Sequence, residues 1–185
     1  MQAIIDACTS GRLPAVPAVV ISNNGASGAL ERAQALQLPA YALGGAEYGD
    51  PARLDQAVLD ILRKHHVDLV VLAGYMKQVG PRTLAGFPGR VINVHPALLP
   101  AHGGRGMYGS RVHSAVLLAG EKETGVTIHV VDSGYDTGPI LAQRRVPVLP
   151  GDSVESLAAR VLPVEHELYV ETLGRIMRGE IELGG

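Results

Sequence analysis

The chain has one cysteine, no tryptophan and a single phenylalanine among its 185 residues. The lone cysteine, Cys8, excludes an internal disulfide and a cysteine-ligated zinc cluster. No apolar run reaches the roughly 20 residues that a membrane-spanning helix needs. The first residues also lack the basic-then-apolar pattern of a signal peptide. We therefore expect a cytoplasmic protein without a membrane partner.

Strong charge of either sign is also missing, since 16 basic residues face 18 acidic ones and the formal net charge is −2. There is no basic excess to attract nucleic acid. With 46% hydrophobic residues, the composition is that of an ordinary globular protein, expected to form a single domain over residues 1–185. Because aromatic rings are scarce, the core must consist mostly of Val, Leu, Ile and Ala.

Short apolar runs alternate along the chain with segments of helical spacing. The expected strands are 16–22, 39–43, 67–73, 91–95, 125–131 and 139–148. The expected helices are 1–10, 29–38, 51–65, 81–87, 110–119 and 154–177. This order predicts an α/β fold with a doubly wound, mostly parallel sheet covered on both faces. The last two strands are close enough in sequence to form an antiparallel hairpin at one edge.

Local signals mark where several helices begin and end. Gly11 is a natural stop for the first helix. Asp50 and Pro51 supply an N-cap and a first-turn proline for the helix at 51–65. Asp152, with Glu155 three residues further on, is typical of a capping box.

Polar side chains collect where the strand 91–95 ends. Asn93 and His95 lie two residues apart, so they project from the same face of that strand. Open α/β sheets bind their ligands at the carboxyl ends of their strands. Asp136 follows later, in the turn-forming segment 132–140. An amide, an imidazole and a carboxylate brought together suit a reaction at a carbonyl carbon, although each residue alone is also typical of an ordinary turn.

Other polar residues indicate less. The histidines are too widely spaced to indicate a metal site, and no Gly-x-Ser-x-Gly elbow marks a nucleophile. His102 is expected in a surface loop and His113 on a helix surface. His129 alternates into the strand 125–131 and is either a core residue or a support for the site. The loop 25–28 opens a helix and could bind an anion, but an ordinary turn is the favoured interpretation.

Four segments carry a resemblance to a known family. They are Leu72-Ala-Gly-Tyr-Met76, Asn93-Val-His-Pro-Ala-Leu-Leu-Pro100, Gly106-Met-Tyr-Gly109, and 125–132 followed by Asp136-Thr-Gly-Pro-Ile140. Together they resemble the phosphoribosylglycinamide formyltransferase family, a resemblance that covers nearly the whole chain. It implies the formyltransferase fold and a reaction in purine biosynthesis. In that reaction the co-substrate 10-formyltetrahydrofolate gives its formyl group to the amine of glycinamide ribonucleotide.

The resemblance also implies roles for particular residues. Asn93 would donate its amide N–H to the oxyanion that develops at the formyl carbon, and a protonated His95 would do the same or pass a proton. Asp136 would hold His95 and raise its pKa. The residues implied for the folate are Tyr75, Met76, Lys77, Val79, Val131 and Asp132. Those implied for the ribonucleotide are Pro96 and Glu165, with His129 in a supporting role and no metal.

The sequence departs from this family at its beginning. Members of the family begin with an apolar strand and a glycine-rich phosphate loop, which here are absent ahead of the helix at Met1. The missing first strand would lie between the strands 16–22 and 67–73. We interpret the chain as starting late, most simply at an internal methionine, and in-frame upstream codons for such a strand would support this. Without that segment we expect weak folding and poor binding of the phosphate substrate.

Two alternatives to the transferase stay open at this point. One is a 10-formyltetrahydrofolate hydrolase, in which water replaces the amine. The other is an inactive relative that binds folate but lacks the phosphate site. In each case the expected partners are small molecules, and the protein is expected to be a monomer or a homodimer.

Overall fold

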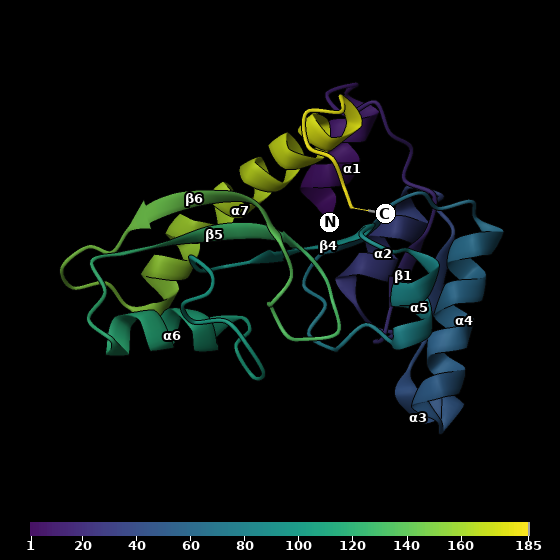
Figure 1. Ribbon diagram of the computed structural model, residues 1–185, viewed down its shortest axis with the longest axis horizontal. Helices are drawn as coiled ribbons and strands as arrows, with labels where there is room; N and C mark the ends of the chain where they lie inside the picture. Colours follow the sequence, from purple (N-terminus) through teal and green to yellow (C-terminus); the bar gives the residue numbers. More distant parts are fainter. Residues whose placement is uncertain (185) are drawn as a thin grey trace.

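The computed structural model describes residues 1–184, and its helices and strands alternate largely as the sequence predicts (Figure 1). The helices are α1 (Gln2–Thr9), α2 (Gly28–Ala35), α3 (Gly45–Tyr48), α4 (Pro51–Lys64), α5 (Pro81–Gly86), α6 (Ser110–Leu118) and α7 (Val154–Met177). The strands are β1 (Val20–Ser22), β2 (Ala40–Ala42), β3 (Val70–Leu72), β4 (Val91–His95), β5 (Glu123–Val130) and β6 (Ile140–Pro147). The short helix α3 was not expected.

Two of the predicted helix signals are confirmed. After α1 the chain turns at Gly11, whose φ of +76° is costly for any residue with a Cβ atom. Asp50 accepts a hydrogen bond from the backbone N–H of Ala52 at 2.9 Å, and Pro51 is the first residue of α4. Local sequence therefore sets the start of α4 without help from distant contacts.

The predicted capping box of α7 is wrong by one residue. Ser153 is the N-cap, and its side chain and that of Ser156 bond reciprocally to each other's backbone N–H groups. Asp152 instead forms a two-point ion pair with Arg160, at 2.6 and 2.7 Å. Glu155 is left exposed on the first turn. The error arose because serine caps a helix as well as aspartate does.

The strands form two sheets instead of one. β1 and β2 pair in parallel, and the second sheet has the order β3-β4-β5-β6. In the second sheet β3 and β4 are parallel, while β4–β5 and β5–β6 are antiparallel. The α/β class and the hairpin at one edge are confirmed, but the sheet is more mixed than expected because β4 also pairs antiparallel with β5.

The sequence analysis places a further strand between β1 and β3, and among residues 1–184 these two strands are not hydrogen-bonded to each other. Their side chains still share one hydrophobic cluster, in which Ile21 and Leu72 pack with buried Leu59 of α4. Side-chain packing therefore connects the two sheets at the point where no backbone hydrogen bonds join β1 to β3. β1 is also shorter than predicted, since Val16 is 87% exposed.

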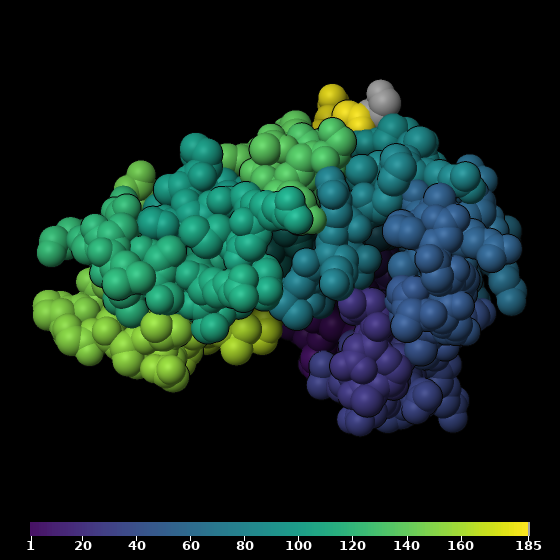
Figure 2. All heavy atoms as spheres, turned by 90° about the horizontal axis from the view of Figure 1, so that it is seen from below, coloured from purple at the N-terminus to yellow at the C-terminus, as the bar shows by residue number. Residues whose placement is uncertain are grey.

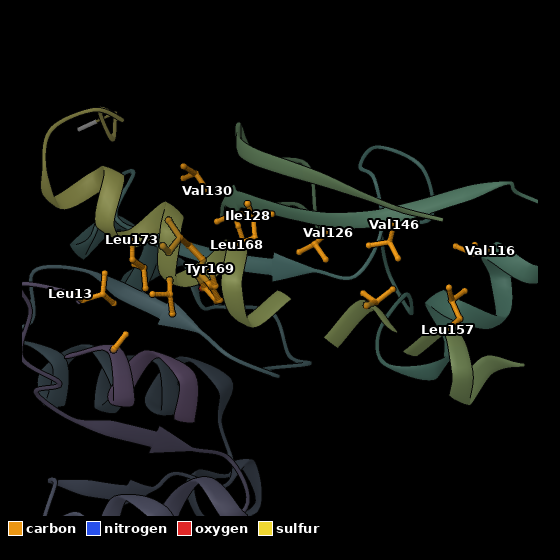
Figure 3. Packing of buried hydrophobic residues seen from close by; sticks show 14 residues of the cluster. Leu13, Val116, Val126, Ile128, Val130, Val146, Leu157, Leu168, Tyr169 and Leu173 are labelled. Carbon is orange, nitrogen blue, oxygen red and sulfur yellow. The ribbon is translucent and has the colours of Figure 1, made fainter. Parts of the chain in front are cut away.

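The larger core lies between α7 and the second sheet. Ile128 of β5 and Leu168, Tyr169 and Leu173 of α7 meet in one buried cluster (Figure 3). The Tyr169 hydroxyl lies 3.0 Å from the carbonyl oxygen of Leu72 and 2.9 Å from that of Ile92, and it donates its hydrogen between them. This phenol therefore joins the last residue of β3 to the second residue of β4, next to Asn93.

The surface is hollowed between the purple-to-blue N-terminal part and the rest of the molecule (Figure 2). The predicted catalytic residues lie on β4 and on the loop between β5 and β6, and the other predicted site residues lie on β5, on α7 and on the loops that leave β3, β4 and β5. No helix within residues 1–184 has the length and apolar character needed to cross a membrane.

Candidate active site

The register between β4 and β5 places the polar residues of the two strands beside each other. Asn93 pairs with His129, and His95 pairs with Thr127. Directly opposed residues of an antiparallel pair carry their side chains on the same face of the sheet. His95 and His129 are 3% and 2% exposed, so both imidazoles sit inside the protein. A polar group at such depth needs a partner.

The partner of the buried His129 is Asn93. The amide nitrogen Nδ2 of Asn93 lies 3.2 Å from Nε2 of His129, whose Nδ1 lies 3.0 Å from the carbonyl oxygen of Val130. A carbonyl accepts only from an N–H, so Nδ1 carries the proton and neutral Nε2 accepts from the amide. One N–H of Asn93 is thereby used, and its second N–H is left for another acceptor.

Asp136 joins the same group from the loop between β5 and β6. Its Oδ2 lies 3.5 Å from Nδ1 of His95, and its Oδ1 lies 3.5 Å from Nε2 of His129. The backbone N–H of Gly104 donates to Oδ2 at 3.0 Å. Asp136 has a φ of +57°, a strained conformation that clusters at functional sites. The structure thus brings Asn93, His95 and Asp136 together through His129.

Asp136 acts to raise the pKa of His95 as expected, but the net change is a fall. Burial lowers this pKa, and the attraction of Asp136 and the hydrogen bond to His102 oppose that effect without reversing it. Burial of Asp136 would raise its own pKa, but the neighbouring His129 and His95 and the backbone N–H of Gly104 together lower it. Of this pair, the resting site therefore favours an ionised Asp136 and a neutral His95.

His95 also has no N–H free to reach a substrate in this arrangement. Its Nε2 donates to the carbonyl oxygen of His102 at 2.9 Å, while its Nδ1 faces Asp136. The 3.5 Å separation from Asp136 exceeds the 2.7–2.9 Å that is typical of a charge-assisted hydrogen bond. Catalytic hydrogen bonds often tighten only when substrate is bound. The side chain of His102, in the expected loop, reaches Glu121 at 3.4 Å.

Thr127 and Gln143 fix the loop that follows His95, and the sequence analysis missed both. The Thr127 hydroxyl donates to the carbonyl oxygen of Ala97 at 2.6 Å and accepts from the Leu99 N–H at 3.1 Å. Gln143 Nε2 bonds both the Thr127 hydroxyl and the Leu99 carbonyl oxygen at 2.9 Å. Thr127 lies two residues before His129 on β5 and so shares its face of the sheet, and this alternation was the signal that could have identified it.

His113 is buried, which contradicts the expectation of a helix surface. His113 is 5% exposed, and its Nδ1 has no hydrogen-bond partner among the described residues. Burial and the nearby His95 both lower its pKa. The prediction failed because the inward face of α6 is wider than its aliphatic residues indicated, and His113 lies beside Val112 on that face.

The residues expected to hold the folate lie on two loops that touch. Val79 of the 73–80 loop and Val131 of the 131–139 loop belong to one hydrophobic cluster. Gln78 Nε2 donates to the carbonyl oxygen of Ser133 at 2.6 Å, a link the sequence analysis did not foresee. Asp132 accepts from Gly134 N–H and the Thr137 hydroxyl and so shapes its own loop. Tyr75 is half-buried, whereas Met76 and Lys77 are exposed.

The residues expected to hold the ribonucleotide lie on different elements. Pro96 directly follows β4, and Glu165 lies on α7. Burial raises the pKa of the Glu165 carboxyl, and the amino group of Met1 opposes this rise. The loop 25–28 is a turn as expected, with the Ser27 hydroxyl accepting from the Leu30 N–H at 3.4 Å.

A cavity of about 350 Å³ opens beside Asp136, between the loops 99–104 and 135–140. A larger one of about 490 Å³ lies over α3, α4 and α5 and touches none of the expected site residues. We favour the smaller cavity as the functional one, because it alone adjoins the group of perturbed carboxylate and imidazoles. Within residues 1–184 no three His, Cys, Asp or Glu side chains are gathered as metal ligands.

Comparison with known proteins adds to this geometry. Residues 1–173 match the formyl transferase family. The phosphoribosylglycinamide formyltransferase of Haemophilus influenzae is 37% identical over 183 residues, which cover 99% of this chain and 84% of that protein. The crystal structure of glycinamide ribonucleotide transformylase 1 from Symbiobacterium toebii has a TM-score of 0.92 and 41% identity, over 100% of this chain and 84% of that one.

A plant relative is similar but longer. The chloroplastic phosphoribosylglycinamide formyltransferase of Arabidopsis thaliana is 42% identical over 180 residues. That alignment covers 97% of this chain but 62% of the plant protein, so this chain spans less than two thirds of that relative. The likeness extends through the segments that carry the candidate site.

Proposed function

The chain belongs to the formyl transferase family, among the phosphoribosylglycinamide formyltransferases, and from that premise we propose that it formylates glycinamide ribonucleotide in purine biosynthesis. The formyl donor is 10-formyltetrahydrofolate, a co-substrate. The convergence of Asn93, His95 and Asp136 beside a cavity is the observation that carries this proposal. It supplies a hydrogen-bond donor, a carboxylate and imidazoles at one point.

The first step is attack by the amine nitrogen on the formyl carbon. A C–N bond forms, and the carbonyl electron pair moves to oxygen as an oxyanion. Asn93 donates its unused amide N–H to that oxyanion. A pre-aimed donor of this kind stabilises a transition state by about 3–4 kcal/mol, or roughly 10²–10³ in rate.

The attacking nitrogen then loses a proton. Asp136 is the acceptor within the group, because its carboxylate is held ionised, and the proton passes to it directly or through water. Collapse of the adduct breaks the bond from carbon to the folate nitrogen, and that nitrogen takes up the proton that Asp136 received. His95 lies against Asp136 and keeps that carboxylate oriented for the proton transfer.

The two touching loops support the placement of the donor. The residues assigned to the folate are Tyr75, Met76, Lys77, Val79, Val131 and Asp132. Pro96 and Glu165 are assigned to the ribonucleotide, and no metal takes part in these steps. The plant relative is named as chloroplastic, so a cytoplasmic location stays a prediction here, as does a monomeric or homodimeric state.

The test mixes the purified protein with 10-formyltetrahydrofolate, with and without glycinamide ribonucleotide. Tetrahydrofolate release is followed by absorbance and the formylated product by mass spectrometry. Turnover that depends on the amine supports the transferase. Turnover without the amine would assign the protein as a hydrolase, and binding without turnover would assign it as an inactive relative.

A further inference from the structure

A buried carboxylate outside the candidate site has no role in the mechanism above. Asp55 lies on α4, on the same face as Leu59 and Leu62, and is 7% exposed. Among residues 1–184 it forms no ion pair with a lysine, arginine or histidine. A buried charge without a counter-charge needs several hydrogen bonds to offset its lost hydration.

The start of α5 supplies those hydrogen bonds. Asp55 Oδ2 accepts from the backbone N–H of Arg82 at 2.7 Å. Its Oδ1 accepts from the backbone N–H of Thr83 at 3.0 Å and from the Thr83 hydroxyl at 2.6 Å. Thr83 is itself almost fully buried. The carboxylate therefore joins two helices at the point where the 73–80 loop enters α5.

The last residue of that loop lies directly on the carboxylate. A Cβ atom added to Gly80 would be 2.1 Å from the Asp55 Cγ and within 2.5 Å of both oxygens. Gly80 is therefore required at this position, and its backbone cannot shift toward α4. At its other end the loop leaves β3 at Leu72, whose carbonyl oxygen is bonded by buried Tyr169.

We propose that Asp55 is a positioning residue that holds the 73–80 loop in the shape that binds the folate donor. This inference rests on the proposed function, which assigns Tyr75, Met76, Lys77 and Val79 of the loop to that donor. Asp55 acts through the backbone of Arg82 and Thr83 and does not touch substrate. The Tyr75 side chain is close enough for the charge of Asp55 to add to the rise in its pKa that burial causes.

The test compares Asp55→Asn with Asp60→Asn, a matched change at an exposed position on the same helix. Tetrahydrofolate binding is measured by calorimetry, and both Michaelis constants and kcat are measured at a temperature where circular dichroism shows each variant folded. Asp55→Asn is expected to weaken tetrahydrofolate binding about tenfold, since the loop spends less time in the competent shape. The kcat and the Michaelis constant for the ribonucleotide are expected to stay within about twofold, and Asp60→Asn is expected to change nothing.

A second readout does not depend on activity. The Tyr75 phenol is titrated by ultraviolet absorbance, as the difference between each protein and its Tyr75→Phe counterpart. Asp55→Asn is expected to lower the pKa of Tyr75 toward its ordinary value. If Asp55→Asn does not fold, Thr83→Val removes one of the bonds at nearly constant volume and is expected to weaken tetrahydrofolate binding about threefold.

The outcomes separate this inference from the proposed function. Wild-type protein that binds no tetrahydrofolate would overturn the proposed function and this inference with it. Wild-type binding that is unchanged in folded Asp55→Asn or Thr83→Val would overturn only the role of Asp55. A rise in both Michaelis constants together with a fall in kcat would also overturn the role of Asp55, because it would indicate general damage to the fold.

Discussion

The strands of this molecule differ in how deeply they are buried, and β4 and β5, at the centre of the second sheet, stand apart from the others. β5 is buried from its second residue to its last, and β4 is mostly buried. Every residue of β1 and β3 is half-buried, and β2 is similar. β3 belongs to the second sheet too, and its edge strand β6 has one buried residue, Val146, so deep burial is confined to β4 and β5 and does not extend over the whole sheet.

The candidate catalytic group is built on these two deeply buried strands. Asn93, His95 and His129 lie on β4 and β5, and Asp136 is held against them by Gly104. Stability is not uniform across a protein, and regions with few buried contacts open more readily. The chemistry is therefore placed where the backbone is most firmly held, while the N-terminal sheet contributes surface and packing.

Replacing Asp136 with asparagine should separate chemistry from stability within the buried part. We expect turnover to fall by about 10²–10⁴, because the amide cannot accept the proton of the amine. Affinity for tetrahydrofolate should change by less than about threefold. Steady-state kinetics and calorimetry measure these quantities, with exposed Asp68→Asn as the control. Unchanged turnover would remove Asp136 from the mechanism.

Matched core truncations should show the contrast between the two parts directly. Ile128→Ala on β5 is expected to lower the free energy of unfolding by about 2–5 kcal/mol, because the side chain is fully buried. Ile21→Ala on half-buried β1 should lower the free energy of unfolding by only about 1 kcal/mol. Urea unfolding at one temperature measures both. Equal losses would mean that the N-terminal sheet is as tightly packed as the other.

The features that could be predicted from the sequence are those that local sequence determines. The alternation around Asn93 and His95 placed both side chains on one face, because the period of a strand is a local property. The start of α4 at Asp50 and Pro51 was predicted for the same reason. The extent of β1 was not, because the end of a strand depends on a neighbour that the local sequence does not contain, and Val16 has none.

Hydrogen bonds between distant segments were also beyond local patterns. Gln78 reaches Ser133, and Thr127 holds the loop at Leu99, across separations that no short motif encodes. His113 was assigned to the surface because a single histidine on a helix gives no indication of which neighbour covers it. The effect of Asp136 on the pKa of His95 was predicted correctly, but the larger and opposite effect of burial was not apparent in the sequence.

His129→Gln should sharpen the account of the buried part with a smaller effect. The glutamine lacks the ring nitrogen that accepts from Asn93, so the amide is expected to populate more than one orientation. We expect kcat to fall about tenfold, since one preorganised donor is partly lost, with tetrahydrofolate affinity nearly unchanged. Kinetics on Asn93→Ala and on the double variant then form a cycle. Fully additive losses would show that His129 does not act through Asn93.

The smallest effect concerns pH and the buried histidines. Burial lowers the pKa values of His95 and His113, so the unfolded chain takes up protons first as pH falls through about 6.5. Stability is then full above that pH and is lost below it, by at most about 1.4 kcal/mol per group for each pH unit. The melting temperature should fall between about pH 7.5 and pH 5.5, and His113→Gln should reduce the fall, while the exposed control His166→Gln should not. A fall of the same size in His113→Gln would mean that this imidazole titrates as if it were in water. A rise in the melting temperature toward pH 5.5 would reverse the sign argued here for both histidines.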